Sequence, residues 1–70
     1  MEYSVHFCLN DEELFQVYNA PIPRVGDHLS MEADTFRVQT VTHAWHRGRA
    51  GKPYLYITVA LEMTVEVDDV

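Results

Sequence analysis

Residues 35–65 read TFRVQTVTHAWH, RGRAGKP and YLYITVALEMTV, which are two runs rich in β-branched and aromatic residues around a segment containing Gly and Pro. This pattern predicts a long β-hairpin over 35–46 and 54–65, with its turn at 47–53. In the second run, apolar residues occupy every other position. We therefore expect one row of side chains to face the core: Leu55, Ile57, Val59, Leu61 and Met63.

The first run of this hairpin changes phase along its length. Phe36 and Val38 share one predicted face, whereas Val41 and Trp45 share the other. An extra residue in one strand of an antiparallel pair produces such a change and bends the strand. We therefore predict a β-bulge near 39–40.

Shorter strand signals precede the hairpin. Residues 3–9 alternate, which predicts a half-buried strand with Tyr3, Val5, Phe7 and Leu9 on one side and Ser4, His6 and Cys8 on the other. Residues 14–19 and 28–31 are further strand candidates, separated by the prolines and the Gly-Asp turn within 21–27. The charged segment 10–13 is predicted to be a hairpin turn, with one helical turn as the alternative.

Together these signals predict an all-β fold. We expect a small five-stranded antiparallel, partly open barrel of the Src-homology-like or oligonucleotide-binding-like type. The single domain is expected over 1–65, followed by an acidic C-terminal tail at 66–70. Because a chain of 70 residues buries only a modest core, self-association as a homo-oligomer is a realistic source of further stability.

Cysteine content and the first residues indicate the cellular setting. Cys8 is the only cysteine, which excludes an internal disulfide. A lone thiol, and a start without the features of a secretory signal, lead us to expect a cytoplasmic protein. No apolar run approaches the ~20 residues that span a bilayer, so a membrane partner is not expected.

The charge balance is acidic, with eleven Asp and Glu against five Lys and Arg and a formal net charge of −6. This excess opposes sequence-independent attraction to phosphate backbones and favours solubility. Nucleic acid is therefore a disfavoured partner.

Residues 20–62 contain the segments Ile22-Pro23-Arg24-Val25-Gly26-Asp27-His28-Leu29 and Phe36-Arg37-Val38-Gln39-Thr40-Val41-Thr42-His43. Through these segments the chain resembles small β-barrel proteins that are found, uncharacterised, in bacteria and phages. The shared pattern is a Pro-x-Val-Gly-Asp turn, a short strand and an aromatic-x-Val-x-x-Val strand. It implies a barrel fold and an accessory role in a phage or mobile element, including binding of a host protein. The resemblance does not identify any functional residue in this chain.

No arrangement of histidines or cysteine predicts catalysis or a bound metal. His43 and His46 lie three positions apart on a predicted strand, so they face opposite sides and do not chelate one ion. Cys8 and His6 share a face but are separated by ~6.6 Å of strand, too far for a direct thiol–imidazole hydrogen bond.

The charged segments also carry no catalytic or nucleotide-binding pattern. The acidic pairs at 12–13 and 68–69 fall in a turn and a tail, where solvated charge is the usual state. The segment 48–52 lacks the spacing of a phosphate-binding loop, and Pro53 stands where that loop has Ser or Thr. We expect no enzymatic activity, no catalytic residue, no metal and no cofactor.

The turn of the long hairpin is the candidate binding site. Arginine and large aromatic side chains carry much of the energy at protein interfaces, and both are concentrated here. The predicted partner-binding residues are Trp45, Arg47, Arg49, Lys52, Tyr54 and Tyr56. The alternative is a solvated hairpin tip whose aromatic rings cover the sheet.

The leading functional hypothesis is a non-enzymatic protein-binding accessory module that binds or inhibits a host protein. One alternative is an acidic mimic of nucleic acid that blocks a host nuclease or DNA-binding protein, motivated by the charge of −6. Others are a structural homo-oligomeric component, in which an open barrel edge pairs with its copy, and a single-stranded nucleic-acid binder.

Overall fold

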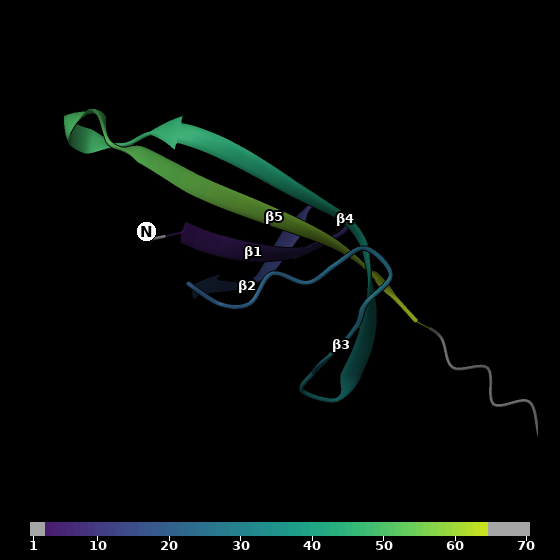
Figure 1. The fold of residues 1–70 in the computed structure, drawn as a ribbon. Helices are drawn as coiled ribbons and strands as arrows, with labels where there is room; N and C mark the ends of the chain where they lie inside the picture. The colour runs from purple at the N-terminus through teal and green to yellow at the C-terminus, as the bar shows by residue number, and fades with distance from the viewer. Residues whose placement is uncertain (1–2, 65–70) are drawn as a thin grey trace, which may run out of the picture.

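A computed structural model describes residues 3–64, which form one five-stranded sheet (Figure 1). Its elements are β1 (Tyr3–Leu9), β2 (Glu12–Tyr18), β3 (His28–Met31), β4 (Asp34–Arg47), the three-residue 3₁₀ turn η1 (Arg49–Gly51) and β5 (Pro53–Met63). The strands lie in the order β2-β1-β5-β4-β3. Residue 65 and the tail predicted at 66–70 lie outside the described residues.

The orientation of one strand pair corrects the antiparallel prediction. β1 and β5 run parallel, in the register Val5 with Ile57 and Phe7 with Val59, whereas the other three pairs are antiparallel. Three strands intervene in sequence between β1 and β5, so the chain has room to return in the same direction. Alternation within a strand predicts which residues share a face. It does not predict which strand lies beside it or in which direction that strand runs.

The local predictions around the hairpins are confirmed. The long hairpin forms between β4 and β5, and its register shifts between Val38 and Thr40, where the bulge was expected. The segment between β1 and β2 is a tight turn in which Asn10 and Asp11 have φ of 51° and 67°. Two consecutive positive φ values are typical of a type I′ hairpin turn, so the alternative of a helical turn at 10–13 is wrong. The helical turn in the described part of the chain is η1.

The core is organised around β5, which is hydrogen-bonded on both sides. Its alternate residues pack against β1 and β4, and the buried apolar set is Val5, Phe36, Val38, Leu55, Ile57, Val59 and Leu61. Met63 was predicted to continue this row but is 52 % exposed, because it lies at the last position of β5. The core therefore lies on one face of the curved sheet.

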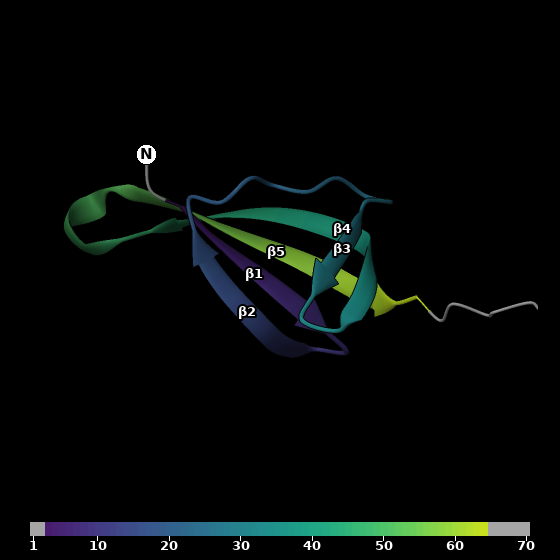
Figure 2. The same ribbon diagram turned by 90° about the horizontal axis from the view of Figure 1, so that it is seen from below.

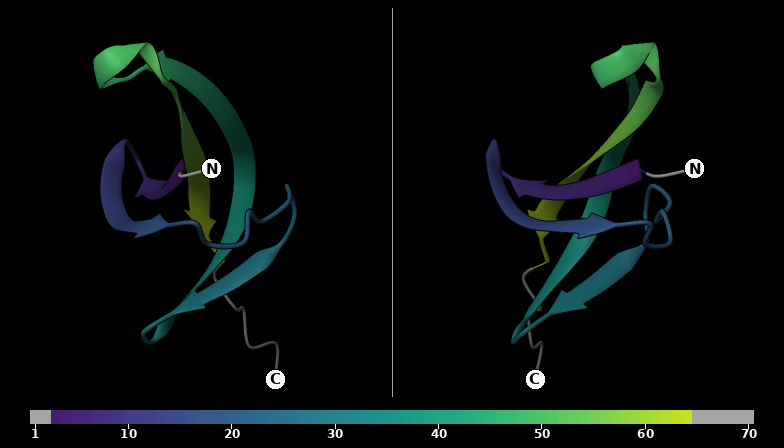
Figure 3. Two further views of the ribbon diagram at one scale, coloured as in Figure 1. Left: turned by 60° about the vertical axis from the view of Figure 1, so that its left-hand side comes forward. Right: turned by 90° about the vertical axis from the view of Figure 1, so that its left-hand side faces the viewer.

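The sheet curls without closing. β2 and β3 are its two edges, and the connection over 19–27 crosses the open side between them (Figures 2 and 3). The connection is held at both ends, since Asn19 N donates to Tyr3 O and Gly26 N donates to Val38 O. The fold is an open half-barrel. Within residues 3–64, no helix has the length and apolar character needed to span a membrane.

Shortening Ile57 should test the central position of β5. Ile57 is fully buried, so Ile57→Val should cost about 0.5–1.5 kcal/mol and Ile57→Ala about 2–5 kcal/mol. Since a core of this size supplies roughly 3–5 kcal/mol, Ile57→Ala should largely unfold the domain. Urea unfolding followed by circular dichroism measures both changes. Val25→Ala, at a position 66 % exposed, is the control, and equal stability of all three variants would contradict this description of the core.

Candidate functional site

A cluster of polar side chains lies on the outer face of β1, opposite the apolar core. Ser4 is fully buried and His6 is 4 % exposed, although both belong to the face of β1 that was predicted to be solvated. The ring of Tyr56 stacks on the ring of His6, with centroids 3.8 Å apart and planes at 13°. The start of β1 is therefore buried on both faces, and the prediction of a half-buried strand is wrong there.

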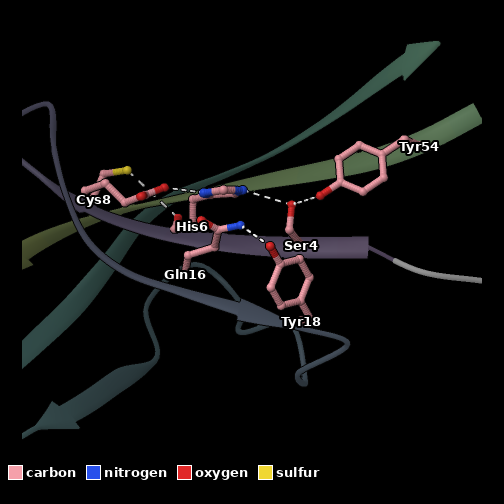
Figure 4. Close-up of polar contacts among 7 residues, drawn as sticks. Ser4, His6, Cys8, Gln16, Tyr18 and Tyr54 are labelled. Carbon is pink, nitrogen blue, oxygen red and sulfur yellow. Dashed lines mark hydrogen bonds and ion pairs between the residues drawn. The ribbon is translucent and has the colours of Figure 1, made fainter. Parts of the chain in front are cut away.

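The cluster is one continuous chain of hydrogen bonds (Figure 4). The Tyr54 hydroxyl donates to Ser4 Oγ. Ser4 Oγ lies 2.8 Å from His6 Nε2, and His6 Nδ1 contacts Glu13 Oε1. In this order Ser4 donates to Nε2 and the imidazole donates from Nδ1 to the carboxylate, so every proton has one acceptor. We call these four residues the polar cluster.

Strand geometry explains how the four residues meet. Ser4 and His6 are two positions apart on β1 and therefore point to the same side. The pairing of β1 with β2 is irregular, because Phe7 faces Phe15 whereas Cys8 faces Glu13. This bulge places Glu13 on the outer face, within reach of His6. The pattern Ser-x-His was visible in the sequence, but the bulge that supplies Glu13 was not.

The polar cluster has the order of groups found in serine hydrolases, namely hydroxyl, imidazole and carboxylate. Its environment differs in one decisive respect. Ser4 is fully buried and its oxygen already accepts a hydrogen bond from Tyr54, so a substrate does not reach it in this arrangement. The cluster instead joins β1 to β2 through Glu13 and to β5 through Tyr54. Within the described residues, every buried side-chain nitrogen and oxygen has a partner.

Two weakly acidic groups beside the polar cluster are held in their neutral forms. Burial raises the pKa of the Cys8 thiol, and the carboxylates of Glu13 and Asp11 raise it further. Burial likewise raises the pKa of the Tyr56 hydroxyl, with Glu13 as the next largest cause. Since the thiolate is the reactive form of cysteine, Cys8 has the environment of an inert thiol.

The hairpin tip is the second surface of interest. β1 begins opposite Leu55, so positions 46–54 of the β4–β5 hairpin project beyond it (Figure 1). Trp45 is 57 % exposed and, with His46, Arg47, Gly51 and Pro53, it lines an open hollow of about 360 Å³. We define the hairpin tip as residues 45–53.

Four of the six predicted binding residues divide between two faces of the hairpin. Trp45 and Arg47 lie together at the hollow, and Lys52 is exposed at the end of η1, the turn that also contains the backbone of Arg49. Tyr54 and Tyr56 lie on the other face, where they contact Ser4 and His6. His46 lies edge-on to Tyr56, with centroids 5.8 Å apart.

A third surface lies between the two edge strands and was not predicted. Residues of β1, β2 and β3 line an apolar cleft of about 260 Å³, formed by Phe7, Phe15, Val17, Leu29, Ser30 and Met31. Phe15 is 41 % exposed there. The sequence predicts each strand, but it does not indicate that β2 and β3 face each other across an opening.

The two histidines of β4 do not converge on one site. His43 and His46 pair with Ile57 and Tyr54, which face opposite sides of β5. No group of three or more His, Cys, Asp or Glu side chains that would hold an ion occurs among residues 3–64.

Comparison of the chain with protein-family models, with curated proteins and with solved structures returned no match.

The hydrogen bonds of the polar cluster should be energetically coupled. Ser4→Ala leaves the Tyr54 hydroxyl and the His6 ring without their shared partner, at a cost of about 1–3 kcal/mol. Tyr54→Phe should cost less in the Ser4→Ala background than in the wild type. Urea unfolding of the two single variants and the double variant measures the coupling. Strictly additive effects would show that the two hydroxyls act independently.

Cys8 should react slowly with a thiol reagent such as dithionitrobenzoate. Because its pKa is raised, the pH at which the labelling rate reaches half its maximum should be higher than in the chain unfolded in urea. Glu13→Gln should lower that pH, since it removes one of the charges responsible. A folded-state midpoint at or below that of the unfolded chain would contradict the assignment.

Proposed function

We propose that this chain is a non-enzymatic protein-binding module that uses the hairpin tip as its binding surface. The exposure of Trp45 supports the proposal best, because 57 % of this large aromatic residue is in contact with solvent. Trp and Arg are the residues that most often dominate interface energy, and here Arg47 lines the same hollow.

The setting of the tip suits binding. The two strands that carry it are paired without interruption from Thr40–Ala60 to Arg47–Pro53, so Trp45 sits on a pre-ordered backbone. A pre-ordered surface loses less conformational entropy when it binds. The adjacent basic groups favour a partner surface that combines an apolar recess with carboxylates.

We also propose the cellular role that the sequence resemblance implies. The module is a cytoplasmic accessory protein of a phage or mobile element, and its target is a protein. Its half-barrel belongs with the small binding barrels of the Src-homology-like or oligonucleotide-binding-like type.

A photo-crosslinking residue at position 45 tests the proposal. Benzoylphenylalanine replacing Trp45 should crosslink one protein at near-equal stoichiometry in a host lysate. The same probe at Tyr18 is the matched control, because Tyr18 is also a large exposed aromatic, at 68 %, but lies on β2. Capture should weaken as salt rises but persist at moderate salt, because salt screens only the charged part of the contact.

Two outcomes would contradict the proposal. Equal crosslinking from positions 45 and 18 would show that the hairpin tip has no preferred partner. Recovery of nucleic acid alone, lost steeply with rising salt, would assign the basic tip to phosphate contacts instead.

A further inference from the structure

We infer that copies of this chain bind one another head to tail, with the hairpin tip of one copy seated in the apolar cleft of the next. The inference rests on the proposed function, because it uses the same binding surface and names its partner. The cleft lies between β2 and β3 and is lined by Phe7, Phe15, Val17, Leu29, Ser30 and Met31.

The apolar character of both surfaces supports the pairing. Five of the six residues that line the cleft are apolar, and Phe15 exposes 41 % of its surface there. The cleft volume of about 260 Å³ lies below the roughly 300–1,000 Å³ of small-molecule pockets, which suits inserted side chains better than a cofactor. Trp45 is the exposed aromatic side chain of the tip, and its burial would remove a large apolar area from water.

Charge complementarity identifies the partner as a second copy. No Asp or Glu occurs between Thr35 and Leu61, whereas four of the five Lys and Arg lie within that span. All eleven acidic residues lie outside it. Residues 35–61 are therefore basic, and the remainder of the chain is acidic.

The acidic groups lie next to the cleft. Asp34 pairs with the cleft residue Met31, Glu32 follows Met31 directly, and Glu12 begins β2, the strand of Phe15. We call Asp11, Glu12, Glu32 and Asp34 the carboxylate end; all four are exposed. None of these carboxylates, and neither Arg47 nor Lys52, forms a salt bridge within residues 3–64, where the ion pairs are His6–Glu13 and Arg37–Glu62.

The tip does not reach the cleft of its own chain. Trp45 pairs with Leu55, whereas Phe7 and Phe15 of the cleft lie at the level of Val59, four positions further along β5, about 13 Å of extended strand. The strand is held in the sheet on both sides for most of that length. A contact between the two surfaces is therefore intermolecular.

The two surfaces are different, so the contact is heterologous. Each copy then keeps one free tip and one free cleft, and the assembly closes as a ring or grows as a filament. A heterologous contact of this kind can be distinguished by experiment from a symmetric one.

Sedimentation velocity over a range of protein and salt concentrations tests the inference. The wild type should associate reversibly, and association should weaken as salt rises. Trp45→Ala should weaken it by about thirtyfold or more, as expected for a central aromatic contact. Phe15→Glu should also abolish it, because it places a charge in the cleft. Tyr18→Ala is the control and should leave association unchanged.

Mixing the two defective variants gives the decisive result. Trp45→Ala keeps an intact cleft and Phe15→Glu keeps an intact tip, so an equal mixture should form a dimer although each variant alone is monomeric. A symmetric tip-to-tip or edge-to-edge contact predicts no such rescue. Circular dichroism checks folding, and Asp34→Lys, at an exposed position, replaces Phe15→Glu if that variant unfolds.

The failure of this inference is distinguishable from failure of the proposed function. A wild type that stays monomeric at its highest soluble concentration, or that associates with unchanged affinity after Trp45→Ala, overturns the head-to-tail contact. If the probe at position 45 then captures a different protein, the hairpin tip remains a binding surface for that partner. If the probe captures only a second copy, and mixing rescues assembly, the head-to-tail contact holds.

Discussion

The parallel pairing of β1 with β5 joins the two parts of this chain into one sheet. β1 and β2 form one hairpin, and β3, β4 and β5 form a meander; apart from this pairing, the link between them is the connection over 19–27. A two-stranded hairpin is marginally stable by itself in water. The pairing allows Val5 to pack against the alternate apolar residues of β5, and those residues form most of the buried core. The half-barrel therefore depends on β5 having a strand on each side.

The same pairing fixes what lies on the outer face. In the observed register Ser4 is opposite Tyr56 and His6 is opposite Thr58. A shift by one residue would turn Ser4 and His6 toward the apolar core and Val5 toward solvent. The polar cluster adds to this preference, because its hydrogen bonds to Tyr54 and Glu13 form only when β1 is in register with both neighbours. The buried polar groups thus help to specify the register in which β1 pairs with its neighbours.

The sequence predicts local features well and long-range ones poorly. Period-two alternation indicated β1 and β5, and the phase change after Val38 indicated the bulge in β4, because each of these signals lies within one strand. The direction of β1 relative to β5, the bulge that places Glu13 beside His6, and the cleft all depend on which strands become neighbours. Exposure of Trp45 follows from its place near a hairpin turn. The separation of Tyr54 from Trp45 follows from alternation, whereas the composition of the turn alone predicts that both residues belong to one site.

An open half-barrel leaves two strand edges unpaired, and its charges affect how copies of the chain approach one another. Exposed edges invite pairing between identical chains. β2 begins with Glu12 and Glu13, and β3 is only four residues long and is followed by Glu32. Charged residues at strand edges disfavour edge-to-edge pairing of two copies. The basic hairpin meets no such repulsion at the acidic edges and carries the exposed Trp45. The charge distribution that disfavours symmetric edge pairing therefore favours a contact between unlike surfaces.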